Sequence, residues 1–580
     1  METDGKVSAR PLGRLRSGRF LPAIDRTHLV FGGVALILIV LVVSPLVQLM
    51  IQSLQHEGTG AATLDNYVQA FTNQRHLVAI WHSILLGLAV ATLCVILGVP
   101  MAWAVAQTNM PGKSIVSLLV LTAFITPDYL NSISWILLAG PNAGWINRAF
   151  VAVTGSSSGI LNIYSFWGIA FVVSISALPY VFIFTATALR SIGAEMIDAG
   201  RILGAGVLRT TFGIVLPLVL PAILGGAIIT FLEAIAIFGT PALIGLPARY
   251  TVISTQLWEF FGFPMKVEVA CAYSVPLVLL TVGLFWLQKR MTKRRGYIVQ
   301  TGKAAVVKPI DLGPYRWVAL AGCLLVLSLV VVLPYLTLIE AAFSRAWGAG
   351  LSWSNLTLDN FYSVMTNPAI ESSMLHTFSY ALAAAILAVT LGSLVAYAVV
   401  RRIIPFGQIL SIVCLAPFVI PGMVLAIGFY AAYAPAPLAL YGTATIIIFA
   451  FTTRFLPIAF ANASAAMRTI NPDMENQVRN LGGDRVLAVR YVVFPMLKQS
   501  LIGAGILVFI PALRELSTAI FLSVEDTRTV SVMIFDLSEQ GRLETLAALG
   551  IVLLFSTIVV VGIGFKLIGR DFLLRRDASW

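Results

Sequence analysis

The chain has 580 residues, of which 58% are hydrophobic and 11% are charged, and its mean hydropathy is +0.91. Soluble domains carry about 25% charged residues, so the composition excludes a water-soluble globular protein. The net charge of +12 would suggest nucleic-acid binding in a soluble protein. In a membrane protein, it must first be compared with the distribution of Lys and Arg over the loops.

A helix needs about 20 apolar residues to cross the hydrocarbon core of a bilayer, and the sequence contains a dozen such stretches. In chain order, the predicted helices are 29–52, 78–106, 114–138, 162–188, 218–240, 268–288, 317–341, 373–400, 408–432, 441–463, 499–522 and 546–568. The sequence therefore predicts an all-α polytopic membrane protein. Its predicted parts are a basic cytoplasmic tail (1–28), a first six-helix half (29–288), a cytoplasmic linker (289–316), a second six-helix half (317–568) and a cytoplasmic tail (569–580).

The two halves are copies of one another. Residues 64–67 (LDNY) recur 294 positions later as 358–361 (LDNF), and Leu203-Gly204 recurs 278 positions later as Leu481-Gly482. The offset changes because the loop before the fourth helix is shorter in the second copy. Since six is an even number, both halves insert the same way up, which predicts two parallel repeats around an axis along the membrane normal.

Most of the 38 Lys and Arg residues fall in the segments that share a side with the amino terminus. Cytoplasmic loops carry such an excess, so we expect both termini to be cytoplasmic. The net charge then reports membrane topology, and the predicted surroundings are a lipid bilayer without a nucleic-acid partner.

The segment between the fourth and fifth helix of each half is long, helical in pattern and repeated. In the second copy, Asn471-Pro472 suits an N-cap and a first helical residue, and Gly482 fits the C′ position after a helix. Met474, Val478 and Leu481 recur at helical spacing, which predicts a short amphipathic helix on the cytoplasmic face. Such a helix could simply cover the bundle, but its repetition favours docking to a two-fold partner.

The first copy resembles a known motif. Asp198-Ala199-Gly200 is followed after three residues by Gly204, and after nine more by Ile214-x-Leu216-Pro217. This pattern is similar to the EAA loop of ABC importer permeases, which seats a coupling helix in a cleft of the ATPase subunit. The resemblance implies ATPase-coupling roles for Glu195, Asp198, Ala199, Gly200, Gly204 and Pro217.

The second copy departs from this motif. Asn476-Gln477-Val478 replaces the acid and both small residues, although Gly482 and Pro495 keep the spacing. The coupling residues implied there are Asp473, Glu475, Asn476, Gly482 and Pro495. Because Gln477 and Val478 prevent a close approach of backbones, we expect the two halves to couple asymmetrically, with Glu475 as a substitute contact.

The resemblance extends over nearly the whole chain. Two fused permease halves, with residues 238–243 (FGTPAL) and 512–519 (ALRELSTA), look like the permeases of the ferric-iron importer family. The resemblance implies a type I ABC importer permease fold in a bacterial inner membrane, two copies of an ATP-binding subunit and a periplasmic binding protein. Related permeases that carry thiamine, polyamines or phosphonates leave those substrates open.

The chain contains no GxxxxGK[ST] pattern for binding nucleotide phosphates. ATP and Mg are therefore expected on the separate ATPase subunit, and this chain is predicted to be neither an enzyme nor the holder of a cofactor. No catalytic residue is predicted.

An ionisable residue at membrane depth costs at least about 2.5 kcal/mol and is a candidate for function. The candidates for a substrate pathway are Asp128, Tyr129, Asn131, Glu233 and Glu515. Pro127 predicts a break in the helix over 114–138 just before Asp128. Asp128 could instead lie in the outer headgroup zone as a helix-end acid. Arg454 could form a buried bridge with Glu515, while Arg514 is expected to have a separate, structural partner.

A secondary transporter would need ionisable residues in both repeats, whereas Gly422 stands at the position of Asp128 in the second copy. His82 and His376 occupy equivalent positions, but neither has a nearby acid or cysteine, so we interpret them as structural residues. The four cysteines lie in apolar stretches without a CxxC pair. No metal site is predicted.

Overall fold

The computed structural model describes residues 26–192, 204, 206–294, 309–350 and 352–568. Within these residues, ten helices are long and apolar enough to span a membrane, or up to twelve if each of two sharply bent helix pairs counts as one span. The all-α membrane architecture predicted from the sequence is confirmed.

The helices of the first half are α1 (Arg26–Leu38), α2 (Ser44–Ser53), α3 (Asp65–Thr72), α4 (Gln74–Gln107), α5 (Lys113–Ile125), α6 (Asp128–Ala139), α7 (Trp145–Thr154), α8 (Phe166–Arg190), α10 (Val207–Thr210), α11 (Leu216–Ala236), α12 (Ile253–Phe260) and α13 (Val267–Arg294). Those of the second half are α14 (Tyr315–Leu327), α15 (Leu333–Ala342), α16 (Asp359–Thr366), α17 (Pro368–Val400), α18 (Gly407–Leu415), α19 (Gly422–Tyr433), α20 (Ala444–Arg468), α21 (Pro472–Asn480), α22 (Arg485–Ala488), α23 (Phe494–Leu513), α24 (Ala519–Leu522), α25 (Val530–Glu539) and α26 (Leu543–Ile568).

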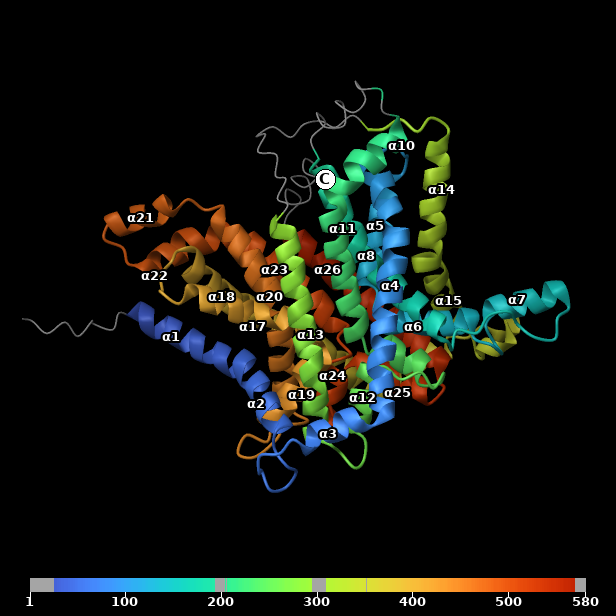
Figure 1. The fold of residues 1–580 in the computed structure, drawn as a ribbon, viewed down its shortest axis with the longest axis horizontal. Helices are drawn as coiled ribbons and strands as arrows, with labels where there is room; N and C mark the ends of the chain where they lie inside the picture. The colour runs from blue at the N-terminus through green and yellow to red at the C-terminus, as the bar shows by residue number, and fades with distance from the viewer. Residues whose placement is uncertain (1–25, 193–203, 205, 295–308, 351, 569–580) are drawn as a thin grey trace, which may run out of the picture.

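Each half is built around three mutually packed long helices. In the first half these are α4, α8 and α11, which run side by side in Figure 1, and in the second half they are α17, α20 and α23. Equivalent helices of the two repeats thus supply the core of each half. Short 3-10 turns occur elsewhere, at Trp347–Ala349, Trp353–Asn355, Ala416–Phe418 and Glu525–Thr527.

Five turns of π-helix occur in the described residues; four of them occur at matching places in the two halves and precede a proline, and the fifth, Pro241–Gly245, begins with one. They are Ile39–Val43, Thr211–Val215, Pro241–Gly245, Ser328–Val332 and Val489–Val493. A proline has no N–H and its ring crowds the carbonyl four residues earlier, so the hydrogen-bond ladder widens just before Pro45, Pro217, Pro334 and Pro495. Pro217 and Pro495 therefore shape the start of α11 and α23.

The third span of each half is bent rather than straight. The axes of α5 and α6 differ by 101°, and the α18 segment and α19 differ by 112°. The sequence predicted one helix over 114–138, with a proline break, and one continuous helix over 408–432. The second prediction was wrong because Pro417 and Pro421 end the helical hydrogen bonding.

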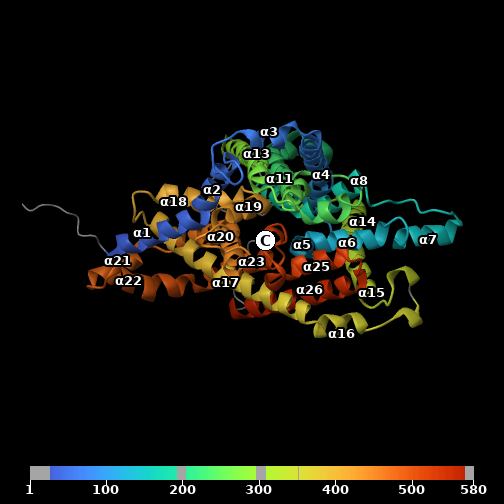
Figure 2. The same cartoon turned by 90° about the horizontal axis from the view of Figure 1, so that it is seen from below.

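The first span of each half packs against the other half. The Thr453 hydroxyl donates to the Leu41 carbonyl at 3.1 Å, and the Gln52 amide donates to the Ala431 carbonyl at 2.9 Å. Conversely, Tyr335 of α15, in the first span of the second half, shares a 2.9 Å hydrogen bond with Thr126 of the first half. Figures 1 and 2 show α1 and α2 beside the second half. This exchange, which the sequence did not predict, locks the halves together.

Close packing between α17 and α20 depends on Gly392. A Cβ at this position would lie 2.8 Å from the Phe460 backbone nitrogen and 3.2 Å from the Ala459 Cβ. Gly392→Ala is therefore expected to force the two helices apart and to destabilise the protein by about 1–3 kcal/mol, measured as a lower melting temperature in detergent. Gly503→Ala in α23 is the control, because its Cβ would meet nothing within 4 Å. Equal melting temperatures for both variants would contradict a role of Gly392 in this close packing.

Candidate functional site

The second repeated segment forms the short helix that the sequence predicted. The Asn471 side chain accepts a 3.0 Å hydrogen bond from the Asp473 N–H, Pro472 begins α21, and Gly482 has a φ of +87° after its end. Met474 is 40% exposed and Leu481 is 89% exposed. Two of the three residues of the predicted apolar stripe are thus exposed on α21, whereas Val478 is half-buried beside Gly483.

Asp473 and Asn476 are exposed on α21, and Pro495 is exposed at the start of α23. Glu475 is different, because it is buried and bound within the chain. Its carboxylate lies 2.6 Å from an Arg401 nitrogen and accepts a 3.0 Å hydrogen bond from the Tyr397 hydroxyl. The sequence did not predict this burial.

In the first copy, Glu195, Asp198, Ala199 and Gly200 lie outside the described residues. Gly204 is described and has a φ of +79°. L-residues with a Cβ rarely adopt this conformation, and the equivalent Gly482 shares it. The two glycines thus have the same backbone conformation at equivalent positions of the two repeats. Figure 1 shows that α10, which follows Gly204, and α21 lie at separate edges of the molecule.

The linker rejoins the helical bundle at the carboxyl end of α4. The Ile310 N–H donates to the Gln107 carbonyl at 2.7 Å, and the Asn109 N–H donates to the Ile310 carbonyl at 2.9 Å. The Asp311 carboxylate accepts hydrogen bonds from the Gly313 N–H and the Asn109 amide, which lower the pKa of Asp311. The end of the linker is thus attached to the end of α4.

A cluster of charged side chains lies where the two halves meet. Asp128 at the start of α6 is within electrostatic range of Arg514, Glu233 and Glu515, and Glu233 on α11 is within range of Arg454. Three acids and two arginines therefore lie within electrostatic range of one another in this partly buried region, and both halves contribute to them. Buried charges persist in such surroundings only when they are paired.

Glu515 and Arg514 have different partners, as the sequence suggested. Arg454 Nε lies 2.9 Å from Glu515 Oε2, and the Thr518 N–H donates to Glu515 Oε1 at 3.0 Å. Arg514 donates to the Phe124 carbonyl and, at 3.3 Å, to the Thr126 carbonyl at the break between α5 and α6. The predicted helix over 499–522 was wrong, however, because α23 ends at Leu513 and both charged residues follow it.

Asp128 lies against a glycine of the same half. A Cβ at Gly239 would come within 2.7 Å of Asp128 Oδ2, so the carboxylate touches the chain immediately after α11. Tyr129 and Asn131 are buried, and the Asn131 amide donates to the Ser176 hydroxyl at 2.9 Å. Asp128, Tyr129 and Asn131 all lie in the first turn of α6. Within the described residues, no three His, Cys, Asp or Glu side chains gather closely enough to hold a metal ion.

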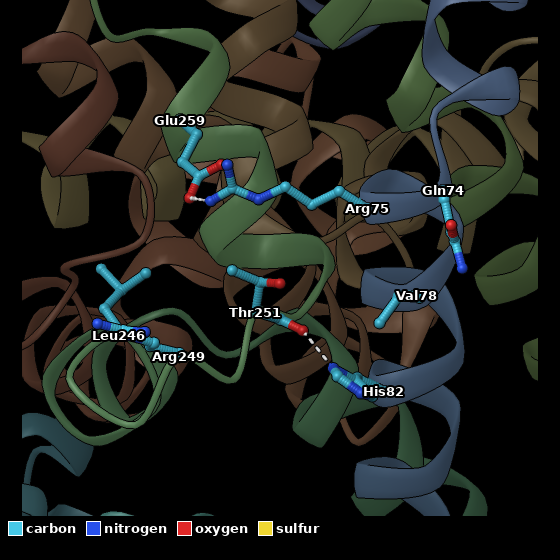
Figure 3. A pocket seen from close by; sticks show the side chains of 8 residues that line it. All are labelled: Gln74, Arg75, Val78, His82, Leu246, Arg249, Thr251 and Glu259. Atoms are coloured by element: carbon cyan, nitrogen blue, oxygen red, sulfur yellow. Dashed lines mark hydrogen bonds and ion pairs between the residues drawn. The ribbon is translucent and has the colours of Figure 1, made fainter.

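A pocket of about 580 Å³ opens at the end of α4 opposite to the linker. Figure 3 shows Arg75 reaching Glu259 and His82 pointing toward the Thr251 carbonyl. The Arg75 to Glu259 distance is 2.6 Å, and Arg249 adds a second arginine to the lining. The pocket is therefore polar and carries more positive than negative side chains.

Both histidines singled out from the sequence hold a backbone carbonyl. His82 Nδ1 lies 2.9 Å from the Thr251 carbonyl, and His376 Nδ1 lies 3.2 Å from the Arg528 carbonyl. His82 also stacks on Tyr250, with ring centroids 3.9 Å apart. The same contact in both halves supports the structural interpretation of these residues.

Comparison with known proteins shows which family part of this chain resembles. Residues 93–297 match the family described as "Binding-protein-dependent transport system inner membrane component". A ferric transport system permease protein of Actinobacillus pleuropneumoniae is 27% identical over 407 residues, which cover 69% of this chain and 58% of the relative. A putative ferric transport system permease protein of Haemophilus influenzae is 26% identical over 416 residues, or 70% of this chain and 64% of the relative.

The match spans less than two thirds of each of these ferric relatives. A putative 2-aminoethylphosphonate transport system permease protein of Salmonella paratyphi A is also similar, at 26% identity over 229 residues, 40% of this chain and 86% of the relative. Residues 93–297 are therefore similar to the inner membrane component of binding-protein-dependent transport systems, and about 70% of the chain is similar to ferric transport system permease proteins.

Proposed function

We propose that this chain is the membrane-spanning subunit of an ATP-driven importer that moves ferric iron, delivered by a periplasmic binding protein, into the cytoplasm. The observation that carries the proposal is the repeated coupling segment. Gly204 and Gly482 have the same left-handed backbone conformation, and α21 presents exposed Met474 and Leu481. Exposed apolar side chains on a short surface helix suit a protein partner.

The proposed partner at these segments is an ATPase subunit in two copies, one for each half. The chain lacks a nucleotide-binding pattern of its own, so ATP and Mg belong on that partner. The partner's dimer closes when it binds ATP and moves the two coupling segments. The halves then rock against each other and open the pathway to the other side of the membrane.

The proposed pathway runs through the charged cluster between the halves. Asp128 belongs to the first half and Glu515 to the second, so relative movement of the halves changes their spacing. Carboxylate, phenol and amide oxygens are ligands that suit hard cations, and Asp128, Tyr129 and Asn131 supply all three on one bent span. A lining without a complete metal cage fits brief transit of an ion rather than its storage.

The choice of ferric iron as the substrate rests on the ferric permease relatives. It is a more specific proposal than the assignment to the importer class. Relatives named for phosphonate and molybdenum transport also match, and thiamine and polyamines stay alternatives. In the proposed orientation both termini are cytoplasmic, so the pocket lined by Arg75, Arg249 and Glu259 opens to the periplasm. We assign the docking of the binding protein to this side.

The substrate is tested by ATP hydrolysis in a complex of the chain with its ATPase subunits, using binding proteins loaded with ferric iron, thiamine or 2-aminoethylphosphonate. Stimulation above the empty binding protein by the ferric form alone supports the proposal. Stimulation by one of the other forms keeps the importer and replaces the substrate. No stimulation by any form, in a complex that hydrolyses ATP, would contradict an import function.

A further inference from the structure

Glu475 and Arg401 form a buried connection between the coupling helix of the second half and a membrane-spanning helix. Arg401 follows α17 and Tyr397 lies one turn before it, so both side chains face the same direction. Glu475 is in the first turn of α21. Arg401 Nε donates to Glu475 Oε1 at 2.7 Å, and the Tyr397 hydroxyl donates to Glu475 Oε2 at 3.0 Å.

The same arginine also holds the corner between α20 and α21. A terminal nitrogen of Arg401 donates to the Ile470 carbonyl at 3.1 Å, and Ile470 lies between the last residue of α20 and the N-cap of α21. The side chains of Arg401 and Glu475 are 11% and 10% exposed. Water therefore competes little for these hydrogen bonds, and charge-assisted bonds in such surroundings are strong.

At the equivalent positions of the first half, the sequence does not repeat the pair of Arg401 and Glu475. Gln107 occupies the position of Arg401, and its amide donates to the Leu189 carbonyl in the last turn of α8, at 2.6 Å. Ile197, outside the described residues, occupies the position of Glu475 in the sequence. Within the described residues, both halves thus hold the helix that precedes the coupling segment, and the second half adds a bond from Arg401 to an acid of the coupling helix itself.

We infer that the Arg401, Tyr397 and Glu475 side chains fasten α21 to α17, so that the coupling helix of the second half moves as one body with that half. This inference rests on the proposed ATPase coupling and makes Glu475 a positioning residue rather than a contact for the partner. The α17 helix spans 33 residues and packs tightly on α20 at Gly392. A displacement of α21 is therefore carried along α17 to the other side of the membrane.

The test uses the full complex with its ATPase subunits and loaded binding protein in proteoliposomes, and it measures the substrate imported per ATP hydrolysed. Glu475→Gln and Arg401→Gln are expected to lower this ratio by about fivefold or more, because one partner of a buried pair is lost. ATP hydrolysis and complex assembly are expected to persist. Arg402→Gln is the matched control, since it removes a neighbouring exposed arginine.

A covalent bridge separates transmission of movement from simple folding. In the double variant Arg401→Cys with Glu475→Cys, a short bifunctional thiol reagent should restore the ratio to near the wild-type value, whereas the unbridged protein should stay uncoupled. The four native cysteines are buried and so react little. A bridged protein that stays uncoupled, or a Glu475→Gln complex with the wild-type ratio, would overturn the inference.

Two comparisons distinguish a failure of this inference from a failure of the proposed function. If loaded binding protein does not stimulate the wild-type complex, the import function itself fails. If the wild-type complex couples and the variants couple equally well, only the connection through Glu475 is wrong. Should both single variants fail to assemble, Tyr397→Phe removes one hydrogen bond without changing charge, and its ratio is expected to fall by about twofold. An unchanged ratio in an assembled Tyr397→Phe complex counts against the connection.

Discussion

Replacing Arg454 with alanine is expected to destabilise the protein by about 3–5 kcal/mol, because it leaves the Glu515 carboxylate buried without its cation. The side chains are 20% and 9% exposed, and Arg454 Nε lies 2.9 Å from Glu515 Oε2. Thr518 alone cannot compensate a buried charge. The melting temperature in detergent, followed by intrinsic fluorescence, measures the loss.

The matched control for this variant is Arg75→Ala. Arg75 lies only 2.6 Å from Glu259, but its side chain is 61% exposed and that of Glu259 is 29% exposed. Such surface pairs contribute about 0–1 kcal/mol, so the melting temperature should change little. Equal losses in the two variants would show that burial does not decide the strength of these ion pairs.

Asp128→Asn is expected to reduce import of ferric iron by about tenfold or more, because it removes an intramembrane charge from the proposed pathway. The substitution keeps the size of the side chain, so the packing against Gly239 and the melting temperature should stay nearly unchanged. Uptake of radioactive iron into proteoliposomes that contain the full complex is the measurement.

Glu371→Gln is the control for Asp128→Asn, since Glu371 is exposed in the first turn of α17. It changes charge equally without touching the cluster between the halves. Wild-type uptake by the Asp128→Asn complex would remove Asp128 from the pathway. It would leave the charged cluster with a purely structural role.

Local sequence patterns predicted the parts of this fold that depend on short-range rules. The N-cap at Asn471 and the left-handed glycine at 482 follow from the needs of a helix start and a helix end, and both are present. The bridge between Arg454 and Glu515 was also anticipated, because a charge inside a membrane needs a partner. Such features can be predicted because their sequence signals lie within a few residues of one another or follow from the need to pair a charge.

Other features depend on packing between distant segments. An acid in the first turn of a helix satisfies the helix dipole whether it faces solvent or protein, so Glu475 gave no sign of its burial against Arg401, 74 residues earlier in the chain. The packing of α1 and α2 against the second half, and of α15 against the first half, leaves no trace in the apolar runs of the sequence. The bend before α19 did have a signal, in Pro417 and Pro421, which the continuous apolar run over 408–432 obscured.

The most direct test of an ATP-driven import function is uptake of radioactive iron by proteoliposomes that contain this chain with or without its ATPase subunits, its ferric-loaded binding protein and internal ATP. We expect uptake only when all of these components are present. Uptake by the chain alone, without ATP, would contradict the import function and would identify a secondary transporter or a channel.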